Sequence, residues 1–349
     1  MKYFHAFTKE QILQHTRIRK FETKIGELVQ TVAGKENLEQ ELENNRAGFA
    51  VIGIPEDIGV KANNGVGGTA SVWTPFLQSF LNIQSSDFLT GDNILMLGYF
   101  DFSDLSRVIE MNAQNFEEKT DAYRHAVNTI DDAVEAVVKL IAQAGKIPII
   151  IGGGHNNAYP CIKGVAKGLM KAGKIPIAQI NAINLDAHAD YRPLEGRHSG
   201  NGFRYAEEDG YMERYFILGF HENYIAQNVW MDIVNNPFMD CISYEDIFIH
   251  EKRSFRQAIQ DATSFVSGNY TGIELDIDSI EHALSSAVTP VGVPVSDARQ
   301  YVYLTARDTQ AAYLHICEGA CQLDDGRRDD STGKLVSYLV SDFVKAHGE

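Results

Sequence analysis

Residues 184–190, with the sequence NLDAHAD, place two carboxylates and an imidazole at alternate positions directly after an apolar run. Alternate side chains of an extended backbone point the same way, so Asp186 and His188 can face one point. Asp190 can join them where the strand turns into a loop. Two carboxylates and one imidazole suit a manganese, zinc or iron ion better than calcium or magnesium. The alternative interpretation is an acidic, solvated loop.

A second pair of carboxylates, Asp276 and Asp278, follows the apolar run at residues 272–277. Two carboxylates side by side at a strand end repel each other and lose hydration unless a cation compensates them. Taken alone, the pair could equally be a helix cap or a loop pair. Beside the first cluster, a metal site becomes the better interpretation.

The third segment, residues 149–155 with the sequence IIIGGGH, ends a predicted strand in three glycines and His155. The glycines allow a tight turn and a close approach to a ligand. A phosphate-binding P-loop is excluded because no Lys-Ser/Thr pair follows. A lone histidine here would be structural, but with two acidic clusters at neighbouring strand ends we expect a ligand role.

Together these segments supply six candidate metal ligands: His155, Asp186, His188, Asp190, Asp276 and Asp278. Six are too many for one ion that keeps an open position. They are enough for two ions bridged by shared carboxylates at about 3.5–4 Å from each other. Such a pair lowers the pKa of a bridging water, which predicts attack by hydroxide on an electrophilic carbon.

Short apolar runs alternate with longer amphipathic segments, a pattern that predicts an α/β fold whose mostly parallel sheet has helices on both faces. The predicted strands are 49–54, 94–99, 148–151, 182–185, 215–218, 241–244 and 272–277. The predicted helices are 71–81, 121–144, 159–172, 224–235, 255–267 and 332–347. Ligands bind at the carboxyl ends of such strands, where the polar clusters lie. We expect an N-terminal extension or cap at residues 1–45 and one catalytic domain at 46–349.

The composition narrows the range of partners. The chain has 349 residues, 44% of them hydrophobic, and a formal net charge of -16. A chain this acidic repels phosphates and anionic lipid, so neither nucleic acid nor a membrane is an expected partner, whereas the net charge says little about a small-molecule substrate. The four cysteines include no C-x-x-C pair and are expected to be reduced thiols; a regulatory disulfide between Cys317 and Cys321 is the alternative. Without an N-terminal apolar run or an 18-residue apolar stretch, we expect a cytoplasmic protein.

Over roughly residues 48–345, these motifs resemble the ureohydrolase superfamily of arginases, agmatinases and formimidoylglutamases. Three separated segments occur in the family's order and at similar spacing. The resemblance implies a single three-layer α/β/α domain around an eight-stranded, mostly parallel sheet. It also implies two Mn²⁺ ions per subunit and self-association into homo-oligomers.

The resemblance also implies a role for each ligand. Residues 152–155 match the family's Gly-Gly-Asp-His segment, and residues 186–190 match its D-A-H-x-D segment in full. The family's D-x-D pair corresponds to Asp276 and Asp278. Two aspartates should bridge the ions and four residues should bind one ion each: Asp186 and Asp276 as bridges, His155 and Asp190 on the first ion, and His188 and Asp278 on the second.

Further residues are predicted to act in catalysis and in substrate binding, and the resemblance to the family suggests His198 and Glu318 among them. Asp190 should accept a proton from the attacking hydroxide and pass it to the leaving amine. His198 falls where some members have a proton-shuttling histidine, with a loop histidine as the alternative. Glu318 matches a late glutamate that pairs with the cationic amidine or guanidinium, or else is an ordinary charged residue. Asn201 and Arg204 are predicted to bind substrate, Arg204 through a bidentate pair with a carboxylate; a surface arginine is the alternative.

Departures from the family pattern narrow the substrate. Gly154 replaces the aspartate before the histidine ligand, which removes a carboxylate beside the first ion. The family's Asp-Pro is absent from residues 279–282, and residues 289–294 match its Pro-Gly-Thr-Gly-Thr-Pro loop only loosely. Residues 53–59 and 64–68 look more like the formimidoylglutamase branch.

The predicted function is therefore hydrolysis of N-formimidoyl-L-glutamate to glutamate and formamide, a step of histidine degradation. Within the enzyme class, the alternative is another ureohydrolase that acts on arginine, agmatine or a guanidino acid. From a different class, the alternative is a catalytically silent member that serves as an assembly or regulatory subunit. The intact set of six ligands argues against the silent member.

Overall fold

Nine strands form one sheet in the computed structural model, which describes residues 2–34 and 37–348. The strands are β1 (Phe4–Ala6), β2 (Phe49–Gly53), β3 (Ile94–Phe100), β4 (Ile147–Ile151), β5 (Ile180–Leu185), β6 (Met212–Phe220), β7 (Met239–Ser243), β8 (Tyr270–Asp276) and β9 (Gln310–Cys317). Their order across the sheet is β1-β3-β2-β4-β9-β8-β5-β6-β7. All seven predicted strands are present.

Eight of these strands run parallel, as expected, and the antiparallel edge strand β1 makes a ninth. β1 was not predicted because three residues are too few to show a periodicity. Its backbone pairing with β3, from Phe4 opposite Phe100 to Ala6 opposite Gly98, defines it instead. β9 was also missed as an apolar run, although it lies in the middle of the sheet between β4 and β8.

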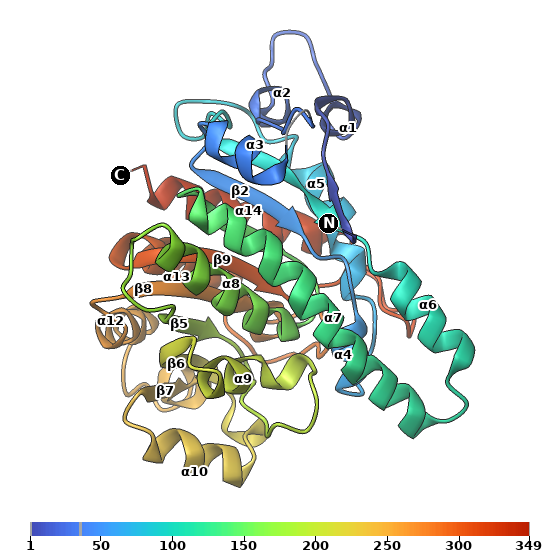
Figure 1. The fold of residues 1–349 in the computed structure, drawn as a ribbon. Coiled ribbons are helices and arrows are strands. Elements are labelled where there is room, and N and C mark those ends of the chain that lie inside the picture. The colour runs from blue at the N-terminus through green and yellow to red at the C-terminus, as the bar shows by residue number, and fades with distance from the viewer. Residues whose placement is uncertain (1, 35–36, 349) are drawn as a thin grey trace.

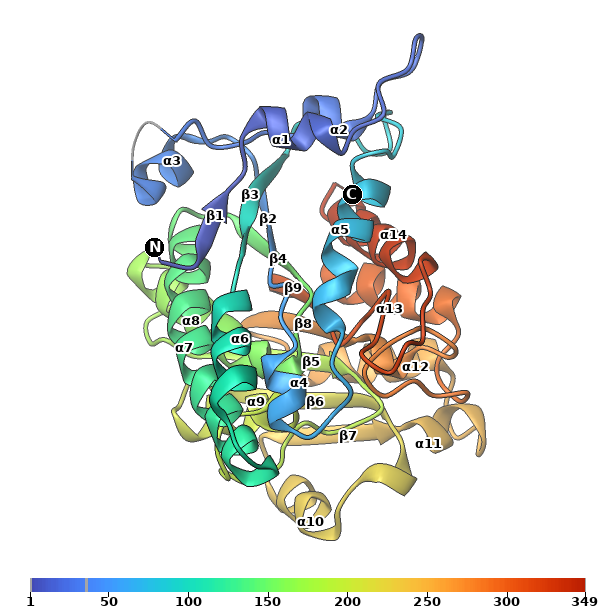
Figure 2. The ribbon, with the colours of Figure 1, turned by 90° about the vertical axis from the view of Figure 1, so that its right-hand side faces the viewer.

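Helices cover both faces of the sheet and give the three layers that Figure 2 shows from the side. One layer contains α6 (Ser103–Asn112), α7 (Phe116–Gln143), α8 (Ala158–Lys171) and α9 (Gly202–Glu208). The other contains α5 (Trp73–Phe80), α12 (Phe255–Phe265), α13 (Val295–Asp308) and α14 (Ser331–Ala346). The short α4 (Ile58–Ala62) and α11 (Tyr244–Phe248) lie beside strand ends, and α10 (Gln227–Asn235) lies near β7 (Figure 1).

Alternate residues of the central strands enter two separate cores. Ile149 and Ile151 of β4 pack in the core on one face, and Ile150 packs in the core on the other. This is why the strand reads as a continuous apolar run, as strands buried on both faces do. The polar residues that follow such a run are then held at the edge of a rigid sheet.

The N-terminal residues pack against the same sheet. They form α1 (Lys9–Gln14), α2 (Ile25–Leu28) and α3 (Leu38–Asn44), and Phe7, Ile12 and Ile25 are buried in one of the two sheet cores. The boundary at residue 45 stays a prediction. Within the described part of the chain, no helix is long and apolar enough to cross a membrane.

Candidate active site

The neighbouring strands β4, β9, β8 and β5 bring the three motifs to one edge of the sheet. Leu185 is opposite Leu275 in the β5–β8 register, so Asp186 and Asp276 follow side by side. Directly after β4, Gly152 and Gly153 have φ angles of 90° and 79°, which a residue with a side chain rarely adopts. This turn returns the chain toward β8 and places His155 beside the two aspartates.

Four candidate ligands converge in the interior, where ligand atoms of His155, Asp186, Asp190 and Asp276 all lie within 4.8 Å of one another. His155 Nδ1 is 2.8 Å from Asp190 Oδ2, 3.2 Å from Asp186 Oδ2 and 3.3 Å from Asp276 Oδ2. The imidazole is fully buried, and neither ring nitrogen has a hydrogen-bond partner. A buried nitrogen aimed at three carboxylate oxygens fits a metal ion.

The other two candidate ligands lie nearer the solvent. His188 Nδ1 is 3.5 Å from Asp186 Oδ1 and 4.0 Å from Asp278 Oδ2, and the His188 side chain is 34% exposed. Asp278 is held by the backbone N–H of Ala287 (3.1 Å). The structure thus brings all six predicted ligands together in an inner and an outer group that share Asp186.

The charges of this cluster are strongly interdependent. Burial and the neighbouring Asp278 and Asp186 raise the pKa of Asp276 well above its usual value. Burial disfavours the charged form of His155, but Cys317 and the surrounding carboxylates outweigh it and raise the pKa of that imidazole. Adjacent carboxylates that cannot all ionise without a counter-charge are the arrangement that a multivalent cation relieves.

A carboxylate does lie beside the first ligand, although Gly154 lacks one. Glu56, which follows β2, accepts hydrogen bonds from Gly154 N (2.9 Å), Gly59 N (3.1 Å) and Asn157 Nδ2 (2.8 Å). A Cβ on Gly154 would lie 2.6 Å from Asn156 Oδ1, so an aspartate does not fit there without movement. A buried carboxylate from the segment after β2 therefore contacts the backbone at position 154, directly before His155.

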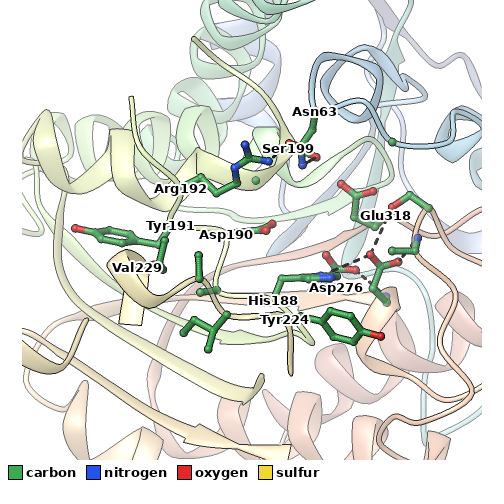
Figure 3. A pocket seen from close by; sticks show the side chains of 18 of the residues that line it. Asn63, His188, Asp190, Tyr191, Arg192, Ser199, Tyr224, Val229, Asp276 and Glu318 are labelled. Atoms are coloured by element: carbon green, nitrogen blue, oxygen red, sulfur yellow. Dashed lines mark hydrogen bonds and ion pairs between the residues drawn. The ribbon is translucent and has the colours of Figure 1, made fainter. Parts of the chain in front are cut away.

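A cavity of about 580 Å³ opens over the cluster (Figure 3). His188, Asp190, Asp276, Asp278 and Glu318 line it. Asp190 and Glu318 have φ angles of 43° and 59°, in the left-handed region that non-glycine residues seldom adopt. Such strain gathers at functional sites, where the surrounding structure compensates its cost.

Glu318 is buried, with one carboxylate oxygen in use and one without a hydrogen-bond partner. Oε1 accepts the backbone N–H of His155 (2.7 Å), and Oε2 has no partner. Burial and the nearby Asp278 raise the pKa of Glu318 to about 8. The unpaired oxygen suits a cationic N–H donor of a ligand in the cavity.

Arg192 is the arginine that the structure places in the cavity wall, and the sequence analysis missed it. Among the described lining residues it is the one arginine or lysine. Its guanidinium donates to Asn63 Oδ1 (2.8 Å) and to Glu195 Oε1 (2.6 Å), which leaves three N–H groups available. Figure 3 shows Arg192 above the Asp276 cluster, with Asn63 and Ser199 nearby. Its position two residues after Asp190 was the available signal.

The remaining predicted residues lie outside the cavity lining. Arg204 donates to Asp232 (2.9 Å) and stacks over Tyr191, so an ion pair already occupies the group expected to bind substrate. Asn201 is buried and holds its own loop through the Gly196 carbonyl (2.8 Å) and Arg197 (2.8 Å). Asn201 therefore holds the loop, Arg204 links α9 to α10, and neither lines the cavity.

His198 is also fully buried, behind the residues that line the cavity. Its Nδ1 accepts from Gly200 N (3.1 Å), and its Nε2 is 3.2 Å from Glu195 Oε1. Burial and the nearby Arg192 lower the pKa of His198 to about 4. Glu195, which lines the cavity, is the side chain that connects this imidazole to it.

The chain resembles known proteins in sequence and in fold. A formimidoylglutamase from Streptococcus pyogenes is 25% identical over 300 residues, which are 84% of each chain. The crystal structure of a formiminoglutamase from Trypanosoma cruzi with Mn²⁺ has a TM-score of 0.68 and 19% identity, and covers 93% of this chain and 98% of that one. A formimidoylglutamase from Bacillus subtilis has a TM-score of 0.71 and 17% identity, with 95% and 94% covered. The arginase family model matches residues 47–344, so the chain belongs to the arginase family.

Proposed function

We propose that this protein is a binuclear manganese hydrolase that cleaves the amidine C–N bond of N-formimidoyl-L-glutamate to give glutamate and formamide. The observation that carries the proposal is the convergence of six ligands under a cavity with a carboxylate at one position and an arginine at another. The formimidoylglutamases among the relatives support the choice of substrate. An amidine with a dicarboxylate tail complements both charges.

The donor set fits two Mn²⁺ ions. His155 and Asp190 would hold the first ion, His188 and Asp278 would hold the second, and Asp186 and Asp276 would bridge them. A mixture of imidazole and carboxylate donors suits manganese. When bound, the ions supply Lewis acidity and a water of lowered pKa. Occupancy would also relieve the repulsion among the buried carboxylates.

The protein groups orient the substrate and move the proton. Glu318 Oε2 accepts a hydrogen bond from the cationic amidine nitrogen, which sets the amidine carbon over the ligand cluster. Asp190 is the group that takes the proton of the attacking water and returns it to the leaving nitrogen. Its left-handed backbone conformation turns the side chain from the end of the motif back into the site.

Arg192 replaces Arg204 as the proposed partner of the substrate carboxylates. Three of its N–H groups remain after the contacts to Asn63 and Glu195, enough for a bidentate carboxylate pair. The hydroxyl of Ser199, which accepts from Asn63 Nδ2 (3.3 Å), is free to donate to the same carboxylate. Both arginines have an ion-pair partner, Glu195 for Arg192 and Asp232 for Arg204, but only Arg192 is among the residues that line the cavity.

A substrate panel on the manganese-loaded protein tests the proposal. Formimidoylglutamate, arginine, agmatine and guanidino acids are each scored for formamide, urea and ammonia. Formamide from formimidoylglutamate, abolished by a chelator and restored by Mn²⁺, is the expected result. Urea release would assign the protein to the guanidine-cleaving enzymes, and a protein that binds Mn²⁺ but hydrolyses nothing would favour a non-catalytic subunit.

We also propose a cytoplasmic location, a place in histidine degradation and self-association. The four free cysteines agree with a reducing compartment. Light scattering on the purified protein measures the oligomer directly. A monomer at micromolar concentration would remove the proposal of self-association and leave the catalytic proposal untouched.

A further inference from the structure

Glu274 is a fully buried carboxylate on β8, two residues before the candidate ligand Asp276. Residues two apart on a strand point to the same face, so Glu274 lies one step deeper than the ligand cluster. Its Oε2 is 3.4 Å from Nε2 of His155. The two nitrogens of that ring therefore face different groups, since Nδ1 faces the ligand carboxylates and Nε2 faces Glu274.

Two further side chains hold the Glu274 carboxylate. Its Oε1 accepts the hydroxyl of Tyr313 (2.5 Å), and its Oε2 is 2.6 Å from Nδ1 of His315. Glu274 and His315 are direct partners in the β8–β9 register, so backbone pairing sets their separation. Tyr313 and His315 are both fully buried.

This group is costly for the fold unless it has a use. A buried carboxylate loses hydration, and such ionic clusters often stabilise no better than apolar residues of similar volume. Its neighbours along β8, Ile273 and Leu275, are apolar and fully buried. An apolar side chain at position 274 would satisfy the core but would leave Nε2 of His155 facing no acceptor.

A histidine that binds a metal ion needs such an acceptor. A histidine that binds an ion through one nitrogen carries its proton on the other, and an acceptor there fixes the tautomer and the ring orientation. Nδ1 of His155 is the nitrogen within 2.8–3.3 Å of Asp190, Asp186 and Asp276. The proton then belongs on Nε2, where Glu274 is the nearby anion.

We propose that Glu274, held by Tyr313 and His315, is a positioning residue that orients His155 toward the first Mn²⁺ ion and raises the affinity for that ion. The inference rests on the proposed two-ion centre. It assigns a function to a carboxylate that has no place among the six ligands.

The test measures Mn²⁺ binding to the full chain by calorimetry and Mn²⁺ electron paramagnetic resonance, beside thermal melting of the chelator-treated protein. In Glu274→Gln, the affinity for the first ion should fall by about 10- to 100-fold, while the metal-free melting temperature stays the same or rises. Tyr313→Phe should lower that affinity by about two- to tenfold, the value of one hydrogen bond. At saturating Mn²⁺, KM should stay unchanged in both variants.

Tyr301→Phe is the matched control. Tyr301 is an equally buried tyrosine whose hydroxyl donates to the backbone carbonyls of Glu274 (2.8 Å) and Ile183 (3.0 Å), not to the carboxylate. The Tyr301→Phe variant should have a changed melting temperature and an unchanged affinity for Mn²⁺. Equal affinities for Tyr313→Phe and Tyr301→Phe would overturn the positioning role, even if Glu274→Gln does not fold. A wild type that binds no Mn²⁺ would overturn the two-ion centre itself.

Discussion

The inner and outer halves of the ligand cluster differ in how tightly the protein holds them. His155 in the inner half is fully buried, packed edge-on against the Phe203 ring and within 3.3 Å of three carboxylates. His188 in the outer half is 34% exposed, and its nearest carboxylates are 3.5 and 4.0 Å away. The same residue types therefore give a rigid site below and an accessible one at the cavity, where a substrate must enter.

The largest effect is expected for the two proposed bridging aspartates. Asp186→Asn or Asp276→Asn should lower kcat/KM by at least about a thousandfold, equivalent to ~4 kcal/mol, because each would remove a proposed ligand of both ions. Steady-state kinetics with metal analysis measures this loss. Asp232→Asn, which changes an aspartate outside the cavity, is the control and should stay near wild type. Activity that survives in Asp186→Asn would contradict a bridging role.

The two histidines should differ in the metal-free protein. Burial disfavours the charged form, but neighbouring anionic groups raise the pKa of both His155 and His188, so each imidazole contributes stability below its ordinary pKa that is lost as the pH rises through the folded value. The charge on His155 is fully buried, whereas that on His188 is partly exposed. His155→Ala should therefore lower the free energy of unfolding by about 3 kcal/mol at pH 6. His188→Ala, which removes a partly exposed group, should lower it by less than about 1 kcal/mol.

Urea unfolding with a chelator present measures both values. His155→Gln is the conservative control, because it keeps a polar group of similar reach without the charge. Equal losses for the two alanine variants would remove the distinction between a rigid inner half and an open outer half.

The cavity beside the outer half contains Arg192, which we expect to bind the substrate carboxylates. Arg192→Ala should raise KM for formimidoylglutamate by about 10- to 100-fold, since a bidentate charged pair contributes ~1.5–3 kcal/mol. Arg204→Ala is the matched comparison and should change KM by less than about twofold, because its Asp232 pair lies outside the cavity. An amidine that carries no carboxylates separates substrate binding from chemistry, because Arg192→Ala should leave the KM for that compound unchanged. The reverse ranking of the two variants would restore Arg204 as the substrate contact.

The smallest effect concerns His198 beneath the cavity wall. Burial and then Arg192 lower the pKa of His198 to about 4, so the unfolded chain takes up a proton between pH 6.5 and 4 that the folded chain does not. Stability is therefore lost as the pH falls through this window. His198→Asn keeps an acceptor for Gly200 N and should reduce that loss by about 1 to 2 kcal/mol. Unfolding curves at pH 7.5 and 4.5 measure this loss of unfolding free energy. Equal losses in the wild type and in His198→Asn would contradict a contribution from His198.

Much of the fold could be predicted because local pattern and tertiary environment agree. β4 reads as a strand because both of its faces are buried, and α7 reads as a helix because apolar residues recur along one side. α13 was missed because its charged residues are spread among the buried ones, from Asp297 and Arg299 to Arg307. β9 was missed although it is central, since its polar His315 and the nearby Glu318 interrupt the apolar pattern.

The sequence by itself determined the six candidate ligands, because the two-residue period of a strand and the common edge of parallel strands convert spacing directly into position. It did not determine which arginine faces the cavity, because contacts with distant segments place the two side chains, with Asn63 beside Arg192 and Asp232 beside Arg204. Likewise, only strand pairing placed Glu274 beside His315 and behind His155, and only the chain path placed the Glu56 carboxylate beside Gly154. The candidate metal ligands can be identified from short stretches of sequence, whereas the groups that orient the ligands and the substrate are set by contacts between distant segments.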